Sequence, residues 1–289
     1  MNKLVAVLKL TRIEHSIMLV VAVIAAELIV LGIPSLPIFL LSLITPFFIS
    51  MASFAINDYF DLETDRANNR VDRPLVNRSL YRSEALLVAI STFLIGMAAS
   101  ALINVYAFAI ALVFSVLAFL YSYRLKDTPI LGNAYIALTM VIPFVFGDYV
   151  VSGTLSIKIV LISFIIFLSG FAREMHGMVR DYSGDSKVRR TKNLVYHMGK
   201  KVTASVALIM YFEAIAISLF LFFYIAPFAG NLYYLAPIAV ADVVLAYVAI
   251  GYVTRSSRSF FMASRNLSLL AMFIALVAYL ISPVLFAAV

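Results

Sequence analysis

Acidic and amide side chains recur at helical spacing in one stretch of this sequence. Asn57, Asp61 and Asp65 lie four residues apart, so on a helix they share one face, about 6 Å apart along the axis. Oxygen ligands favour Mg²⁺, which binds through a few carboxylates and completes its shell with water and phosphate oxygens. Asp58 points about 100° away from this face and is a weaker candidate ligand.

A second pair of acids has the same spacing. Asp181 and Asp185 follow the sixth apolar stretch, as the first row follows the second. Carboxylates at i and i+4 repel each other by about a few tenths of a kcal/mol on an isolated helix, so a single row is equally explained as a solvated helix end. Two such rows are explained most simply by bound cations. We therefore expect both groups to hold metal and to face one site.

Basic residues surround both acidic groups and suit a phosphate ligand. Arginine binds phosphate oxygens through two parallel bonds, and lysine supplies a point charge. The neighbouring bases are Arg66, Arg70, Arg73, Arg78, Arg180 and Lys187. The chain has no cysteine, which excludes thiolate sites, and no glycine-rich phosphate loop. Its three histidines, His15, His176 and His197, show no metal-binding spacing, and we interpret them as polar loop residues.

The composition requires that these groups be positioned by membrane helices. The chain has 289 residues, of which 64% are apolar and 13% are charged, and its mean hydropathy is +1.03. A soluble domain carries about 25% charged residues, so a soluble protein is excluded. Apolar stretches of about 20 residues lie at 15–33, 36–57, 84–103, 105–123, 131–150, 157–175, 202–226, 232–253 and 266–287. We predict an all-α membrane protein, one domain over residues 1–289, with nine transmembrane helices around a central site.

The basic residues also predict the orientation. Of the 22 lysines and arginines, all but Lys158 lie in five segments that nine spans place on the same side. The positive-inside rule makes that side cytoplasmic, with the N-terminus inside, the C-terminus outside and the site opening near the cytoplasmic face. Glu27, Glu213 and Asp242 lie within predicted spans, where an ionisable group is either functional or a protonated, hydrogen-bonded carboxyl.

The ordered set of motifs resembles the UbiA superfamily of intramembrane prenyltransferases. Residues 57–65 and the segment Asn69-Arg70-Val71-Asp72-Arg73-Pro74 are similar to the family's first aspartate motif and the stretch that follows it. Residues 181–185 are similar to its second motif, although Ser183 and Gly184 stand where many relatives carry further acids. The segment 121–126 with Asn133 resembles a Tyr/Lys/Asn segment, in which either Tyr121 or Tyr123 matches the family's tyrosine.

The resemblance implies transfer of a polyprenyl group from its diphosphate, with Mg²⁺ as the cofactor. Breaking the allylic bond leaves negative charge on the diphosphate, which metal ions and basic side chains stabilise, and aromatic faces stabilise the cation. The resemblance implies metal binding by Asn57, Asp58, Asp61, Asp65, Asp181 and Asp185. It makes Lys126 and Arg73 the leading diphosphate contacts, with Arg66, Arg70, Asn133 and Lys187 behind them, and places Tyr121 or Tyr123 beside the bond that breaks.

The acceptor is less determined. The segment 69–74 and the chain length look closest to archaeal members that prenylate geranylgeranylglyceryl phosphate, and residues 172–201 carry eight bases against three acids, enough to hold a second phosphate. Positive-inside bias explains the same surplus, so an aromatic acceptor such as 4-hydroxybenzoate stays an alternative. An ion-coupled transporter is the rival class, although most acids lie near cytoplasmic helix ends. The expected partners are a polyprenyl diphosphate, a hydrophobic or aromatic acceptor and membrane lipid, with no nucleic acid and no obligate protein partner.

Overall fold

The computed structural model describes residues 2–30, 32–128, 130–188, 194–255 and 257–287, with the side chains of 183–188 and 286–287 left out of the description. The helices are α1 Lys3–Thr11, α2 Ile13–Ile29, α3 Leu36–Ala67, α4 Arg82–Ala101, α5 Val105–Tyr123, the short 3₁₀ helix η1 Leu125–Asp127, α6 Leu131–Ser152, α7 Ile157–Val188, α8 Leu194–Tyr224, α9 Leu232–Thr254 and α10 Arg258–Ala287. The described residues contain no strand. The prediction of an all-α fold is confirmed.

Seven helices are long and apolar enough to span a membrane, and they indicate an integral membrane protein. They are α3 to α6 and α8 to α10. The other two predicted spans correspond to α2, which has 17 residues, and to α7, which changes from apolar to charged at Arg173. The count of nine spans, the cytoplasmic opening and the orientation therefore stay predictions.

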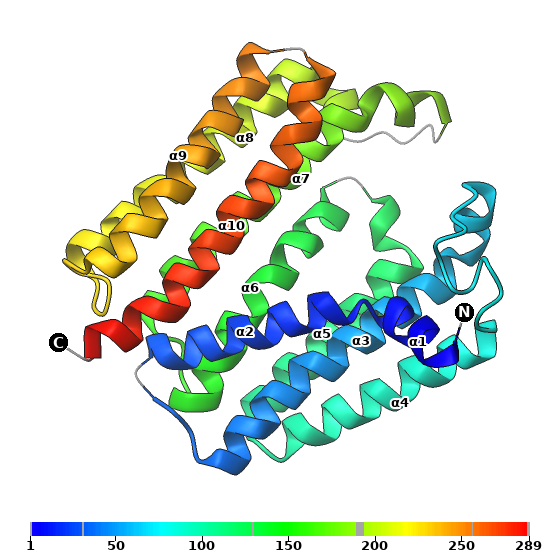
Figure 1. Cartoon of the computed structure of the whole chain (residues 1–289), viewed down its shortest axis with the longest axis horizontal. Helices are drawn as coiled ribbons and strands as arrows, with labels where there is room; N and C mark the ends of the chain where they lie inside the picture. Colours follow the sequence, from blue (N-terminus) through cyan, green and yellow to red (C-terminus); the bar gives the residue numbers. More distant parts are fainter. Residues whose placement is uncertain (1, 31, 129, 189–193, 256, 288–289) are drawn as a thin grey trace. The chain divides into compact units, whose positions relative to one another are not determined.

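The chain forms two compact units, of which the first comprises Met1–Ile24, Ile33–Lys126 and Phe146–Thr154. Within this unit α3 packs along α4 and α5, and α1 lies against α3 (Figure 1). Small residues such as Ala55, Ala85 and Ala89 are buried between these helices. At Gly96 of α4 an added Cβ would lie 2.8 Å from the Ile49 side chain. Small residues at such contacts let membrane helices approach closely.

The second unit comprises Ala25–Gly32, Asp127–Val145 and Leu155–Val289. Its helices α7, α8, α9 and α10 pack against their neighbours in sequence, and α10 also contacts α7 (Figure 1). Its core contains buried alanines together with larger side chains such as Tyr211 and Met175. Where α9 passes the start of α10, an added Cβ on Gly251 would lie 2.0 Å from the Phe260 ring. Only glycine allows this contact.

Both acidic motifs lie on helices that continue past the predicted span ends. We expected the second span to end at 57, but α3 continues to Ala67, and α7 continues beyond 175 to Val188. No glycine or proline interrupts the chain between Asn57 and Ala67. The α3 helix stops at Asn68, and Asn69 has a left-handed φ of 51°, a conformation that asparagine tolerates. The predicted common face of the first row therefore exists.

Candidate functional site

The first cluster consists of the α3 residues Asn57, Asp58, Asp61 and Asp65 with the bases Arg12, Arg73 and Lys126, all within the first unit. Asp61 is held between two donors on the exposed side of α3. The Asn57 amide donates to one Asp61 oxygen at 2.9 Å, and the Lys126 ammonium donates to the other. The side chains of Asp61 and Lys126 are each 23% exposed. Solvent and a ligand can therefore reach this contact.

Asp58 lies on the inner side of the same helix and is only 2% exposed. The guanidinium of Arg12 donates to it at 2.9 Å, and that of Arg73 approaches its two oxygens at 3.4 and 3.5 Å. Arg73 also lies 3.8 Å from Asp65, so it bridges Asp58 and one acid of the row. Asp58 thus has a buried ion-pairing role in the described structure, apart from the face that carries Asp61.

Sequence reasoning missed Arg12 as a member of this site. Helix α1 ends at Thr11, and Arg12 after it has a left-handed φ of 45°. The side chain of Arg12 at this break between α1 and α2 contacts Asp58. The guanidinium also lies 4.6 Å above the Phe54 ring. The signal in the sequence is the position of Arg12 between two apolar stretches. An arginine that is partly buried there needs an acidic partner.

The other bases expected near the first motif pair elsewhere. Arg66 contacts Glu63 at 3.0 Å. Arg70 contacts Asp72 through two bonds of 3.0 Å, which hold the pKa of Asp72 below its usual value. Their side chains are 46% and 45% exposed. The structure does not bring these two arginines onto Asp58, Asp61 or Asp65.

The two candidate tyrosines differ in their surroundings. Tyr123 is 62% exposed, stacks on Phe119 and meets Phe60 edge to face. Tyr121 is half-buried on the same helix, α5. The choice between Tyr121 and Tyr123 stays a prediction.

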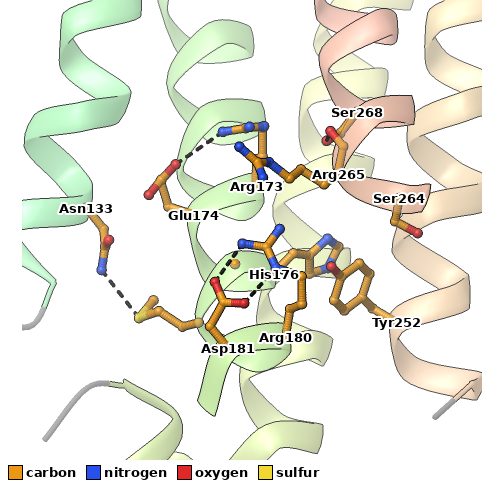
Figure 2. A pocket seen from close by; sticks show the side chains of 12 residues that line it. Asn133, Arg173, Glu174, His176, Arg180, Asp181, Tyr252, Ser264, Arg265 and Ser268 are labelled. Carbon is orange, nitrogen blue, oxygen red and sulfur yellow. Dashed lines mark hydrogen bonds and ion pairs between the residues drawn. The ribbon is translucent and has the colours of Figure 1, made fainter. Parts of the chain in front are cut away.

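A second group of polar residues surrounds a pocket of about 380 Å³ in the second unit, which we call the α7 pocket (Figure 2). Its lining residues are Asn133 of α6, Arg173, Glu174, His176, Gly177, Met178, Arg180 and Asp181 of α7, Tyr252 of α9, and Ser264, Arg265 and Ser268 of α10. Arg180 binds Asp181 through bonds of 2.8 and 2.6 Å, and Arg173 contacts Glu174 at 3.3 Å. Both described acids of the pocket are thus paired with arginine.

His176 is buried in this pocket, contrary to our interpretation of it as a loop residue. It lies on α7, is 3% exposed and stacks on Tyr252 with ring centroids 3.7 Å apart. Burial lowers the pKa of His176 to about 3, so the imidazole is neutral at physiological pH. Sequence reasoning missed His176 because its partner is on α9, far along the chain.

Two further predictions concern residues near this pocket. Asn133 donates to the sulfur of Met178 at 3.3 Å, so it belongs to the α7 pocket, whereas Lys126 belongs to the first cluster. Asp181 lines the pocket. The side chains of Asp185 and Lys187 lie outside the described residues, so nothing is added to the predictions for them.

The intramembrane acids have different environments. Asp242 accepts a hydrogen bond of 2.6 Å from Ser218, as expected of a carboxyl that is satisfied within the helix bundle. Glu27 is 2% exposed, and Glu213 is exposed on α8. None of the three lines the α7 pocket.

The donor set of the first cluster fits Mg²⁺ in kind, because it offers only oxygen ligands from Asn57, Asp61 and Asp65. Within the part of the chain that the structure describes, no three acidic or histidine side chains converge on one point. Arg12, Arg73 and Lys126 neutralise the acids instead.

Comparisons with known proteins show which proteins this chain is similar to. The model of the UbiA prenyltransferase family matches residues 18–277. A digeranylgeranylglyceryl phosphate synthase of Archaeoglobus fulgidus is 38% identical over 240 residues, which cover 83% of this chain and 82% of that protein. A solved structure of a digeranylgeranylglyceryl phosphate synthase has a TM-score of 0.82 at 26% identity, covering 98% of this chain and 99% of that one. A UbiA homologue from A. fulgidus, solved with GPP and Mg²⁺, has a TM-score of 0.64 at 21% identity and covers 95% and 99%, which shows a shared fold.

Proposed function

The chain belongs to the UbiA prenyltransferase family, and from this premise we propose that it transfers a geranylgeranyl group from its diphosphate to geranylgeranylglyceryl phosphate, with Mg²⁺ as cofactor. The similarity to the A. fulgidus synthase along most of both chains carries the choice of acceptor. In this reaction the bond between the allylic carbon and the diphosphate oxygen breaks. A bond forms between that carbon and a free glycerol hydroxyl, and diphosphate and the hydroxyl proton are released.

In this proposal Asn57, Asp61 and Asp65 would hold Mg²⁺, and the bound ion would supply positive charge against the leaving diphosphate. Lys126 and Arg73 leave their acidic partners and donate to phosphate oxygens when the donor binds. Their contacts with Asp61 and Asp65 support this exchange, because both bases are about one-fifth exposed and stand beside the acid row. Arg12 keeps Asp58 paired, so Asp58 is a structural acid and the weakest metal ligand of the set.

The second motif contributes Asp181 and Asp185 to metal binding, with Lys187 as a further phosphate contact. Asn133, Arg66 and Arg70 are more distant contacts to the diphosphate, and Tyr121 shields the allylic cation. The pairing of Asp181 with Arg180 supports this assignment in the same way as in the first cluster, since substrate phosphate can replace the acid as the partner of Arg180.

The membrane setting follows from the charge distribution. We place nine spans in the membrane, with the N-terminus and both motifs cytoplasmic and the C-terminus external. The reason is that 21 of the 22 basic residues lie in five segments that nine spans place on the same side of the membrane. Both isoprenoid tails then lie in lipid. A reporter fused to the C-terminus should report an external location, and a cytoplasmic signal would contradict the count.

One assay tests the reaction. Purified protein in detergent receives geranylgeranyl diphosphate with either geranylgeranylglyceryl phosphate or 4-hydroxybenzoate. We expect product with the lipid acceptor, loss of product in excess EDTA and recovery when Mg²⁺ is restored. Product with the aromatic acid alone would refute the acceptor, and full turnover in EDTA would refute the metal.

A further inference from the structure

The α7 pocket contains buried polar atoms that lack a hydrogen-bond partner. They are Nε of Arg173, both ring nitrogens of His176 and the hydroxyl of Ser264. His176 and Ser264 are 3% and 1% exposed. Buried polar groups in proteins are nearly always paired, and here four unpaired atoms come from three residues around one pocket. This grouping indicates a polar ligand that satisfies them together.

The charges in the pocket indicate that the ligand is an anion. Arg173 and Arg180 already pair with Glu174 and Asp181, whereas Arg265 of α10 forms no ion pair with any described carboxylate. Figure 2 shows the Arg265 side chain pointing toward Arg173. Two guanidinium groups directed at each other repel, and an oxyanion between them turns that repulsion into two charge-assisted hydrogen bonds.

We propose that the α7 pocket binds the phosphate monoester of the prenyl acceptor, with Arg265 and Arg173 as charged contacts and Ser264 and His176 as hydrogen-bond partners. This inference rests on the proposed function, which supplies an acceptor that carries a phosphate. Tyr252, stacked on the imidazole, fixes the orientation of His176. Ser264 and Arg265 both line the pocket from α10, so one helix presents a hydroxyl and a guanidinium to the same phosphate.

The donor diphosphate does not account for the unpaired groups of the pocket. In the proposed function the donor and its metal ions take Asp181 and Arg180, which pair with each other in the described structure. Arg265, Ser264 and the His176 ring remain for a second phosphate, and a monoester needs cations and hydrogen-bond partners of this kind but no metal. The volume of about 380 Å³ lies near the lower end of ligand pockets, about 300–1,000 Å³, which suits a glyceryl phosphate headgroup with its isoprenoid chain outside.

Kinetics of a matched pair of variants test the assignment. Arg265→Gln removes the unpaired charge, and Arg258→Gln makes the same change on an exposed residue of α10 outside the pocket. We expect Arg265→Gln to raise KM for geranylgeranylglyceryl phosphate by about tenfold or more, because the variant loses one charge-assisted contact to the phosphate. KM for geranylgeranyl diphosphate should change by less than about twofold, and Arg258→Gln should change neither. A rise confined to the donor, or no change in either constant, would overturn the proposal.

Direct binding separates this inference from the proposed function. Calorimetry with glycerol 1-phosphate as the probe should show binding to the wild type, weakened by Arg265→Gln and by Ser264→Ala but not by Arg258→Gln. If this pattern appears while the wild type prenylates no lipid acceptor, the pocket stands and the proposed function fails. If the wild type prenylates the lipid but Arg265→Gln alters neither binding nor KM, the pocket assignment fails alone. Inorganic phosphate binding as tightly as glycerol 1-phosphate, with the same Arg265 dependence, would overturn the acceptor assignment.

Discussion

The same substitution at Asp58 and at Asp61 should have two different effects. The two acids are one helical turn apart on α3, yet Asp58 is 2% exposed and contacts Arg12 and Arg73, whereas Asp61 is 23% exposed and contacts Lys126. Asparagine keeps the size of the side chain and removes the charge. We expect Asp58→Asn to lower thermal stability and Asp61→Asn to lower Mg²⁺ affinity and turnover while the melting temperature stays near that of the wild type.

The contacts give the size of each effect. A hydrogen bond to a charged group contributes about 1.5–3 kcal/mol. The Arg12 contact at 2.9 Å is well formed, the Arg73 contacts at 3.4 and 3.5 Å are marginal, and asparagine keeps one acceptor. Asp58→Asn should therefore cost about 2–3 kcal/mol, which is about 4–12 °C at about 2–4 °C per kcal/mol. The partly exposed Asp61 pair contributes about 0–1 kcal/mol. Its loss as a metal ligand should weaken Mg²⁺ binding by at least about tenfold.

The measurement needs helical circular dichroism, because the chain has no tryptophan and no cysteine. Each variant is melted in detergent, and its rate of transfer is measured across a Mg²⁺ titration. Glu14→Gln is the control, since Glu14 is 69% exposed and contacts only His15 among the described residues. Equal losses of melting temperature in the two variants, or Asp61→Asn with the Mg²⁺ dependence of the wild type, would refute the division of roles.

Two further predictions follow from single contacts. Lys126→Gln should raise KM for the prenyl diphosphate by about tenfold or more, since it removes a charged phosphate contact. The control Arg124→Gln changes an exposed neighbour and should leave this KM unchanged. Equal effects of the two substitutions would mean that general surface charge, and not a specific contact, sets the KM. Gly251→Ala should cost about 1–3 kcal/mol, because its Cβ would lie 2.0 Å from the Phe260 ring. Adding Phe260→Leu should restore part of the melting temperature, and no rescue would mean that the strain lies elsewhere.

The apolar helices were predictable from the sequence, and so was the row of the first motif. Stretches of about 20 apolar residues leave few alternatives to a helix, and the spacing of Asn57, Asp61 and Asp65 predicts one face, which α3 provides. The helix ends were predicted less well because we ended the spans where polarity rises. Polar residues extend a helix as readily as apolar ones until a breaker intervenes, and for α3 that point is Asn68.

The partners of the charged residues were not predictable, because packing chooses them. Arg12 meets Asp58 across 46 positions of sequence, and Lys126 meets Asp61 across 65. Lys126 and Asn133 are near neighbours in sequence but lie in different units, because α5 ends at Tyr123 and α6 begins only at Leu131. Spacing predicts which residues share a helix face. It does not predict which helix that face meets.

The bases of the first cluster connect stability to chemistry. Lys126 and Arg73 pair with the acids of the cluster in the described structure, and the proposed reaction uses the same two bases on phosphate. A substitution of Arg73 therefore removes the partner of Asp58 and Asp65 and a proposed phosphate contact at the same time. The activity of such a variant alone cannot separate the two roles. Asp58 offers the separation, because Arg12 and Arg73 both hold it in a buried position. If Asp58→Asn is less stable yet keeps its Mg²⁺ affinity, ion pairing positions this cluster, and metal binding resides on the face of Asp61 and Asp65.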